Sequence, residues 1–254
     1  MLISILFKGL FVGVIVGFVT ASIKSWVDRF FLVILLVSMM GLPIQQAVSI
    51  NLVVVSIAAL MMVLRQWEVL DSVRNNWAVI VIPSVFGGVL GRLFGLQISA
   101  RALLITLGIY AILVGLRLVL IKPMPQKETQ AHPAWQAPIA FLAGWLTGLL
   151  SAGGKPFKVP AYNWLLGRHP KRAYALASLG VAAAAWSALL SQFVVGERLS
   201  PNNLILAIYE FIVITVTALG VGRIWSQKLG KAVTLIIAPI LALVGVRFLI
   251  MARG

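Results

Sequence analysis

The stretch GLLSAGGKPFKVP, residues 148–160, follows an apolar run and places two glycines, two prolines and two lysines within its last eight residues. Glycine and proline break a helix. Broken backbone at membrane depth occurs only where protein buries it or a watery cavity faces it, and an ionisable residue there indicates a functional site. The stretch therefore predicts a discontinuous transmembrane helix that presents positive charge to an anion. The alternative is a cytoplasmic loop whose lysines contact water and lipid phosphates.

The composition around this stretch is that of a polytopic membrane protein. Of the 254 residues, 61% are hydrophobic and 11% are charged, against about 25% charged in a soluble domain. At roughly 20 residues per span, the length allows about eight to ten spans. The net charge of +15 comes from single Lys and Arg residues at the ends of apolar runs. That distribution is typical of cytoplasmic loops and anionic headgroups, so we expect no nucleic-acid partner.

Cysteine and histidine usage argues against metal and cofactor sites. The chain has no cysteine, which excludes disulfides and Cys-based metal or haem sites. Its two histidines, His132 and His169, lie in polar connections. We therefore expect no metal and no cofactor. The N-terminal apolar run lacks a basic segment and a cleavage site, which favours a retained span over a signal peptide.

The apolar runs predict an all-α polytopic protein with two repeats, each of four full spans and one short or re-entrant segment. The repeats are expected at 1–121 and 137–254, joined by the polar linker 122–136, which contains three prolines. Full spans are expected at 3–23, 44–64, 77–97, 102–121, 137–152, 173–195, 203–222 and 232–250, short segments at 30–40 and 161–167, and a polar loop at 65–76.

The direction of the repeats depends on the short segments. If these segments span the membrane, each half has five crossings and the repeats are inverted. If they only dip in, each half has four crossings and the repeats are parallel. The distribution of Lys and Arg favours the inverted arrangement, with the N-terminus outside.

Matches at one spacing indicate that the two halves are a duplication. They are separated by 130 or 131 residues: Gly13 and Gly17 with Gly144 and Gly148, 90–92 with 221–223, and Gly115 with Gly245. Fused repeats are typical of secondary transporters, whose substrate sites lie where the repeats meet.

The same register places Lys24 on Lys155. Equivalent residues around a pseudo-two-fold axis can converge, so we predict one anion site that both lysines share, with Lys158 as a third contributor. The alternative is that Lys24 and Lys155 are interfacial anchors that snorkel.

Pro156 suits the first turn of a short helix, which would offer the backbone N–H groups of Gly153, Gly154 and Lys155 to an anion. Pro160 would remove a hydrogen bond from such a helix. A helix that begins only after Pro160 therefore stays open as an alternative.

The pattern of small residues and prolines resembles the TauE/SafE-type sulfite exporter family (TSUP) over the whole chain. The residues that carry the resemblance are Gly144, Gly148, Ser151, Gly153, Gly154, Pro160, Gly167, Pro170, Ala177 and Ser178. The resemblance implies a bacterial inner-membrane carrier of sulfite and related sulfur-containing anions, often an exporter. Lys155 stands where the family has a third glycine, which favours a larger or differently charged anion.

The predicted substrate site combines the lysines with nearby donors. Ser178 aligns with Asn51 when Pro43 and Pro170 are superposed; helix–helix hydrogen bonding is the alternative role for both. The full predicted set is Lys24, Lys155, Lys158, Ser22, Ser25, Gly153, Gly154, Asn51 and Ser178.

Glu210 is the only acidic residue deep in an apolar run. A buried carboxylate there would carry a coupling proton. The alternatives are a structural ion pair and a glutamate near a membrane interface.

The expected function is a secondary transporter, an exporter or permease, for a small sulfur-containing or organic anion such as sulfite or a sulfonate. The alternative is a membrane-embedded assembly subunit or enzyme. No metalloprotease, nucleophile-elbow or nucleotide-binding motif is present, so we expect that the chain is not an enzyme. The expected partners are the anion, the lipid bilayer and, as an assembly that the sequence allows, a second copy in a homodimer.

Overall fold

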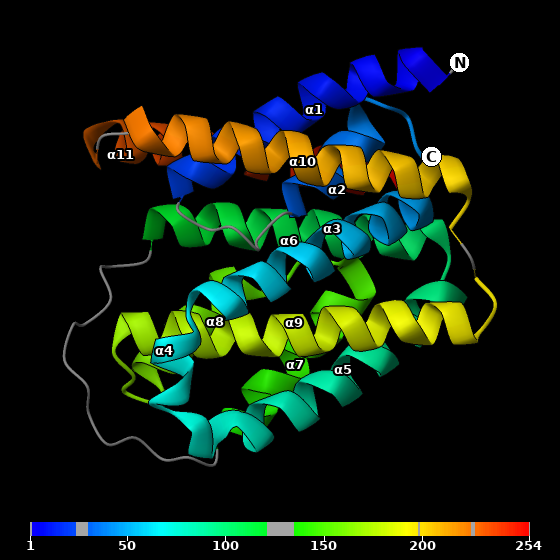
Figure 1. The fold of residues 1–254 in the computed structure, drawn as a ribbon. Coiled ribbons are helices and arrows are strands. Elements are labelled where there is room, and N and C mark those ends of the chain that lie inside the picture. Colours follow the sequence, from blue (N-terminus) through cyan, green and yellow to red (C-terminus); the bar gives the residue numbers. More distant parts are fainter. Residues whose placement is uncertain (1, 24–29, 121–134, 198, 225–226, 254) are drawn as a thin grey trace. The chain divides into compact units, whose positions relative to one another are not determined.

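The computed structural model describes residues 2–23, 30–120, 135–197, 199–224 and 227–253. All regular elements within these residues are helices, which confirms the expected all-α fold (Figure 1). They are α1 (Leu2–Ile23), α2 (Phe30–Ser38), α3 (Ile44–Arg65), α4 (Trp67–Asp71), the short 3-10 helix η1 (Arg74–Asn76), α5 (Trp77–Gln97), α6 (Ala100–Leu120), α7 (Gln136–Leu150), α8 (Lys155–Trp164), α9 (Pro170–Val194), α10 (Pro201–Ile224) and α11 (Gln227–Met251).

Seven of the described helices are long and apolar enough to cross a membrane. Their candidate spans are Ser4–Ser22, Ile44–Arg65, Arg74–Gln97, Ala100–Leu120, Pro170–Val194, Pro201–Ile224 and Ala232–Met251. The expected span 137–152 is instead a helix of 15 residues that ends at Leu150. At 1.5 Å per residue such a helix is about 22 Å long, less than the roughly 30 Å hydrocarbon core.

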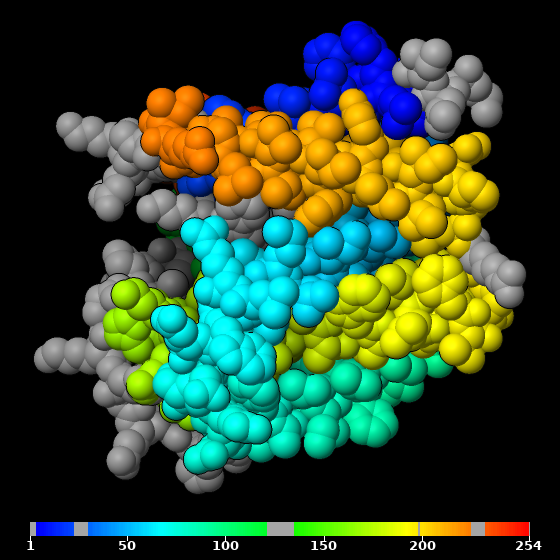
Figure 2. Space-filling view, in the orientation of Figure 1, coloured from blue at the N-terminus to red at the C-terminus, as the bar shows by residue number. Residues whose placement is uncertain are grey.

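The surface of α10 has the apolar character that lipid requires. The side chains of Ile212 and Val216 are 52% and 64% exposed. In the space-filling view of Figure 2, α10 is coloured from yellow to orange and lies on the surface. In water such a surface would be an aggregation hazard, whereas in a bilayer it is matched by lipid tails.

The chain forms two compact units, and each draws on both sides of the predicted linker. Unit 1 contains 1–51, 97–121 and 199–254, and unit 2 contains 52–96 and 122–198. Neither unit coincides with one of the predicted repeats. Most of the predicted linker 122–136 lies outside the described residues, and its last residue, Gln136, is the first residue of α7.

In unit 1, α1 packs against α10 and α6 packs against α11. Glycines allow the close approach of α1 to α10: a Cβ on Gly13 would lie 2.9 Å from the Cβ of Val213, and one on Gly17 would lie 2.6 Å from the Cβ of Thr217. Small residues let transmembrane helices approach closely, which increases their van der Waals contact.

In unit 2, α7 packs in the same manner against α5. A Cβ on Gly148 would overlap the Gly88 carbonyl oxygen, and one on Gly144 would lie 2.6 Å from the Ser84 carbonyl oxygen. In the predicted register, Gly144 and Gly148 are the equivalents of Gly13 and Gly17. Each unit thus contains a helix pair with glycines at the contact, and unit 1 has another between α6 and α11, where a Cβ on Gly108 would lie 2.8 Å from the Gly245 carbonyl oxygen.

The expected polar loop 65–76 contains two short helices, α4 and η1. The Trp77 indole N–H donates to the Leu70 carbonyl at 2.9 Å, and the rings of Trp67 and Trp77 pack edge to face with centroids 5.3 Å apart. α4 also packs against α9. Tertiary contacts of this kind stabilise helices that are too short to form alone.

We expect Gly148→Ala to lower the thermal unfolding midpoint of the detergent-solubilised protein by about 2–10 °C. The added methyl group has no room at the α5–α7 contact, and overpacking costs about 1–3 kcal/mol. Gly220→Ala is the matched control, because a Cβ at Gly220 would meet no atom of another element within 4 Å. Equal midpoints for the two variants would contradict close α5–α7 packing.

Candidate functional site

The backbone between α7 and α8 is broken inside the protein. α7 ends at Leu150, and three of the next four residues have left-handed backbone: Ser151 (φ 50°), Gly153 (φ 71°) and Gly154 (φ 60°). Glycine adopts this conformation readily, whereas it is unfavourable for serine. Residues 151–156 are all buried. This burial agrees with the predicted discontinuous helix and not with a loop in water.

α8 begins at Lys155, before Pro160, so the helix includes both prolines. The N–H of Lys158 donates to the Gly154 carbonyl at 2.9 Å and forms the first full helical bond. Pro160 lacks only the N–H that would reach the Pro156 carbonyl, so the helix loses a single bond. The N–H groups of Gly154 and Lys155 stand at the helix N-terminus, where backbone donors have no intrahelical acceptor.

Lys155 lies buried at this helix start, with 2% of its surface exposed. Its ammonium donates to the Ser178 hydroxyl oxygen at 2.8 Å and lies 3.8 Å from the centre of the Tyr174 ring. The Ser178 hydroxyl in turn donates to the Tyr174 carbonyl at 2.8 Å. The structure thus brings together the predicted residues Lys155 and Ser178. The sequence reasoning missed Tyr174, which lies one helical turn before Ser178.

Lys158 is also buried, but its ammonium meets other groups. It lies 3.5 Å from the Ser84 hydroxyl oxygen on α5 and 5.6 Å from the centre of the Tyr162 ring. A Cβ on Gly180 would overlap this ammonium. Ser178 and Gly180 are two residues apart on α9, hence about 200° apart around its axis. The two lysines therefore meet α9 on roughly opposite faces.

The remaining predicted substrate residues belong to other parts of the chain. Ser22 is buried in α1, and its hydroxyl donates to the Phe18 carbonyl at 2.7 Å. Asn51 is fully buried in α3. Lys24 and Ser25 lie outside the described residues. The anion site shared by Lys24 and Lys155 therefore stays a prediction.

Glu210 lies in unit 1, on the face of α10 that packs against α1. It is fully buried, and a Cβ on Gly9 or Gly13 would lie 2.9 Å from one of its carboxylate oxygens. Among the described residues, neither oxygen has a hydrogen-bond partner. The described residues thus offer no support for the structural ion pair that was one alternative role of Glu210.

A third buried cation, Arg92, has a polar partner inside unit 2. It is 1% exposed, and its Nε donates to the Gln192 side-chain oxygen at 2.9 Å. The Gln192 amide donates onward to the Glu197 carbonyl at 3.1 Å. An arginine within an apolar run was the sequence signal for this network, which ties α5 to α9.

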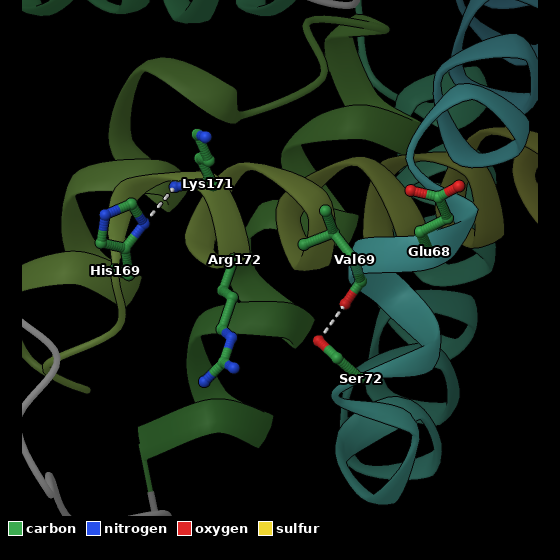
Figure 3. Close-up of a pocket in the computed structure, with 6 residues that line it drawn as sticks. All are labelled: Glu68, Val69, Ser72, His169, Lys171 and Arg172. Atoms are coloured by element: carbon green, nitrogen blue, oxygen red, sulfur yellow. Dashed lines mark hydrogen bonds between the residues drawn. The ribbon is translucent and has the colours of Figure 1, made fainter.

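A pocket of about 430 Å³ lies at the N-terminal end of α9 (Figure 3). The His169 ring accepts a hydrogen bond from the Lys171 backbone N–H at 3.3 Å and caps the helix. Lys171, Tyr174 and Ser178 recur at intervals of three and four residues, so the pocket and the Lys155 contact share one face of α9. The pocket is lined by Glu68, Val69, Ser72, His169, Lys171 and Arg172.

A family model described as Sulfite exporter TauE/SafE matches residues 5–248. The match spans nearly the whole chain, including the break between α7 and α8. No curated protein and no solved structure matches the chain. Within the described residues, no group of three or more His, Cys, Asp or Glu side chains is placed to hold a metal ion.

Proposed function

We propose that this chain, which belongs to the sulfite exporter TauE/SafE family, is a secondary carrier that binds a small anion at the break between α7 and α8. The chain is a membrane protein of an exporter family, with multiple apolar helices. The proposed cargo is sulfite, a sulfonate or a related sulfur-containing or organic anion. The proposed location is the bacterial inner membrane.

The buried ammonium of Lys155 at the start of α8 is the observation that carries the proposal. A charge in the hydrocarbon region costs roughly 2.5–3.5 kcal/mol on insertion scales. A bound anion offsets this cost by pairing with the ammonium, through charge-assisted hydrogen bonds. The N–H groups at the helix start and the helix dipole add favourable interactions with negative charge.

The neighbours of Lys155 suit reversible binding. The face of the Tyr174 ring holds the ammonium by a cation–π interaction, which fixes its place without neutralising its charge. The Ser178 hydroxyl accepts from the same ammonium and donates its own proton to the Tyr174 carbonyl, so it helps to hold the ammonium in place while the other N–H groups of the ammonium face the anion. Because lysine replaces a family glycine at this position, the anion would be larger or differently charged than sulfite in a glycine-only site.

The pocket at the start of α9 supports an entry route. Lys171 is exposed and Arg172 half-buried in its lining. Basic groups at a cleft raise the local concentration of anions. One face of α9 leads from this pocket past Tyr174 to Ser178. We therefore place the approach of the anion along that face.

Transport by the chain alone tests the proposal. The purified full-length protein in liposomes should exchange labelled sulfite at a rate well above that of protein-free liposomes, with a labelled sulfonate as second substrate. Liposomes that contain the protein but move neither anion would overturn the carrier. That result would favour the alternative of an assembly subunit or enzyme.

We expect Lys24→Met to weaken sulfite binding by about tenfold or more, if Lys24 shares the site as its repeat equivalence to Lys155 predicts. The lost charge-assisted bond is worth about 1.5–3 kcal/mol. The measurement is the half-saturating sulfite concentration for exchange in liposomes. Lys8→Met, which changes an exposed lysine of α1, is the control. An unchanged half-saturating sulfite concentration for Lys24→Met would indicate that Lys24 is an interfacial anchor. Of the two repeat-equivalent lysines, only Lys155 would then belong to the site.

A further inference from the structure

The Lys158 ammonium occupies a buried polar position that the contacts of Lys155 do not reach. Lys158 is 1% exposed, and the groups around its ammonium come from three helices of unit 2: Ser84 of α5, Tyr162 of α8 and Gly180 of α9. Lys155 instead meets Ser178, about 200° away from Gly180 around α9.

Gly180 provides the room in which this ammonium lies. A Cβ at Gly180 would overlap the Lys158 nitrogen, would lie 2.8 Å from the Ser84 hydroxyl oxygen and would lie 3.2 Å from Ile80. Any other residue at Gly180 would push the ammonium out of this position. The site therefore depends on the absence of a side chain at one point of α9.

The polar groups at this position are short of acceptors. An ammonium has three N–H donors, and within the described residues its only acceptor is the Ser84 hydroxyl at the long distance of 3.5 Å. Tyr162 is fully buried, and its hydroxyl has no hydrogen-bond partner in the described part of the chain. Buried polar groups of native proteins are nearly always hydrogen-bonded. The Ser84 hydroxyl already donates to the Ala140 carbonyl at 3.3 Å. A water molecule would satisfy the Tyr162 hydroxyl but would bring no negative charge to the ammonium.

We propose that Lys158 and Tyr162, with Ser84 as an acceptor that positions the ammonium, form a second anion position, for an oxyanion, on the opposite face of α9 from Lys155. The inference rests on the proposed function, since it assumes that the protein carries an anion. An oxyanion supplies both the negative charge and the several acceptor atoms that the Lys158 ammonium and the Tyr162 hydroxyl require. Two positions in one unit would let an anion leave one as another is occupied, as multi-site binding does in channels.

The test counts bound anions. Equilibrium binding of labelled sulfite to the purified full chain in detergent should saturate near two per chain for the wild type. Lys158→Met and Lys155→Met should each saturate near one. Lys8→Met, at an exposed lysine, should keep two. Tyr162→Phe keeps the ring and removes only the hydroxyl, so it should weaken the second site about tenfold even if Lys158→Met does not fold.

The possible failures are distinguishable. A wild type that binds one sulfite, which Lys155→Met loses and Lys158→Met keeps, would overturn the second position and leave the proposed function intact. The same holds if Lys158→Met or Tyr162→Phe binds two anions with unchanged affinity. A wild type that binds neither sulfite nor a labelled sulfonate and transports neither would overturn the proposed function as well.

Discussion

Lys155→Met should weaken sulfite binding by one to two orders of magnitude while the protein still inserts into membranes. Methionine keeps an unbranched apolar stem, one atom shorter than lysine, but removes the ammonium that meets Ser178 and Tyr174. Hydrogen bonds to charged groups contribute about 1.5–3 kcal/mol, which corresponds to about 10- to 150-fold in affinity. The measurements are the half-saturating concentration for exchange in liposomes and the affinity of the solubilised protein.

Two further variants test whether the ammonium of Lys155 is what the anion requires. Lys155→Arg should rescue binding only in part, because a planar guanidinium fork does not replace a compact ammonium between a hydroxyl and an aromatic face. Lys8→Met should bind normally, since Lys8 is exposed on α1. Unchanged affinity of a well-inserted Lys155→Met variant would remove the anion site from the break between α7 and α8.

Glu210→Gln should reduce transport driven by a pH gradient at least tenfold while exchange of substrate persists. Glutamine keeps the shape of the side chain but cannot release a proton. A fully buried carboxyl without a polar partner among the described residues is costly to hold as a lone charge, which suits a group that takes up a proton during the transport cycle. The other titratable side chains on the two helices of this contact are Lys8 and Arg223, both exposed, and the half-buried Tyr209.

The measurement is labelled sulfite flux in liposomes with and without an imposed pH difference. Asp71→Asn is the matched control, since Asp71 is exposed at the end of α4 and does not line the pocket. Normal values for both driven transport and exchange in Glu210→Gln would show that Glu210 is not the coupling group. A structural role or an uncoupled mechanism would then follow.

Local sequence signals were sufficient for the long apolar helices and for the break between α7 and α8. Apolar run length predicted where helices lie, because burial in lipid requires it. The run Gly153–Gly154 predicted the end of the preceding helix, and both glycines have left-handed backbone. The first residue of α8 could not be predicted. Whether the helix includes Pro160 depends on the cost of one lost hydrogen bond against the gain from tertiary packing, and the local sequence does not show that packing.

The part of the site that the sequence could not predict depends on contacts between residues far apart in the chain. Lys155 and Ser178 both stood in the predicted set, and the structure joins them at 2.8 Å. Ser84 is 74 residues from Lys158. No sequence pattern around Ser84 or Gly180 indicates that either residue lies next to this lysine. The α4 helix was missed for a similar reason. The polar stretch 65–76 has no apolar periodicity that would predict a helix, and contacts of the Trp67 and Trp77 indoles stabilise it.

The composition of the two units also has a consequence for biosynthesis. Every segment of unit 2 lies within 52–198, whereas unit 1 includes both 1–51 and 199–254. At about 5–20 residues per second, α1 leaves the ribosome roughly ten to forty seconds before its packing partner α10. Unit 2 therefore has all its parts while unit 1 still lacks two helices. Until α10 is made, lipid or the insertion machinery must cover the glycine-lined face of α1. Among the helix pairs described above, α1 therefore waits longest for its packing partner.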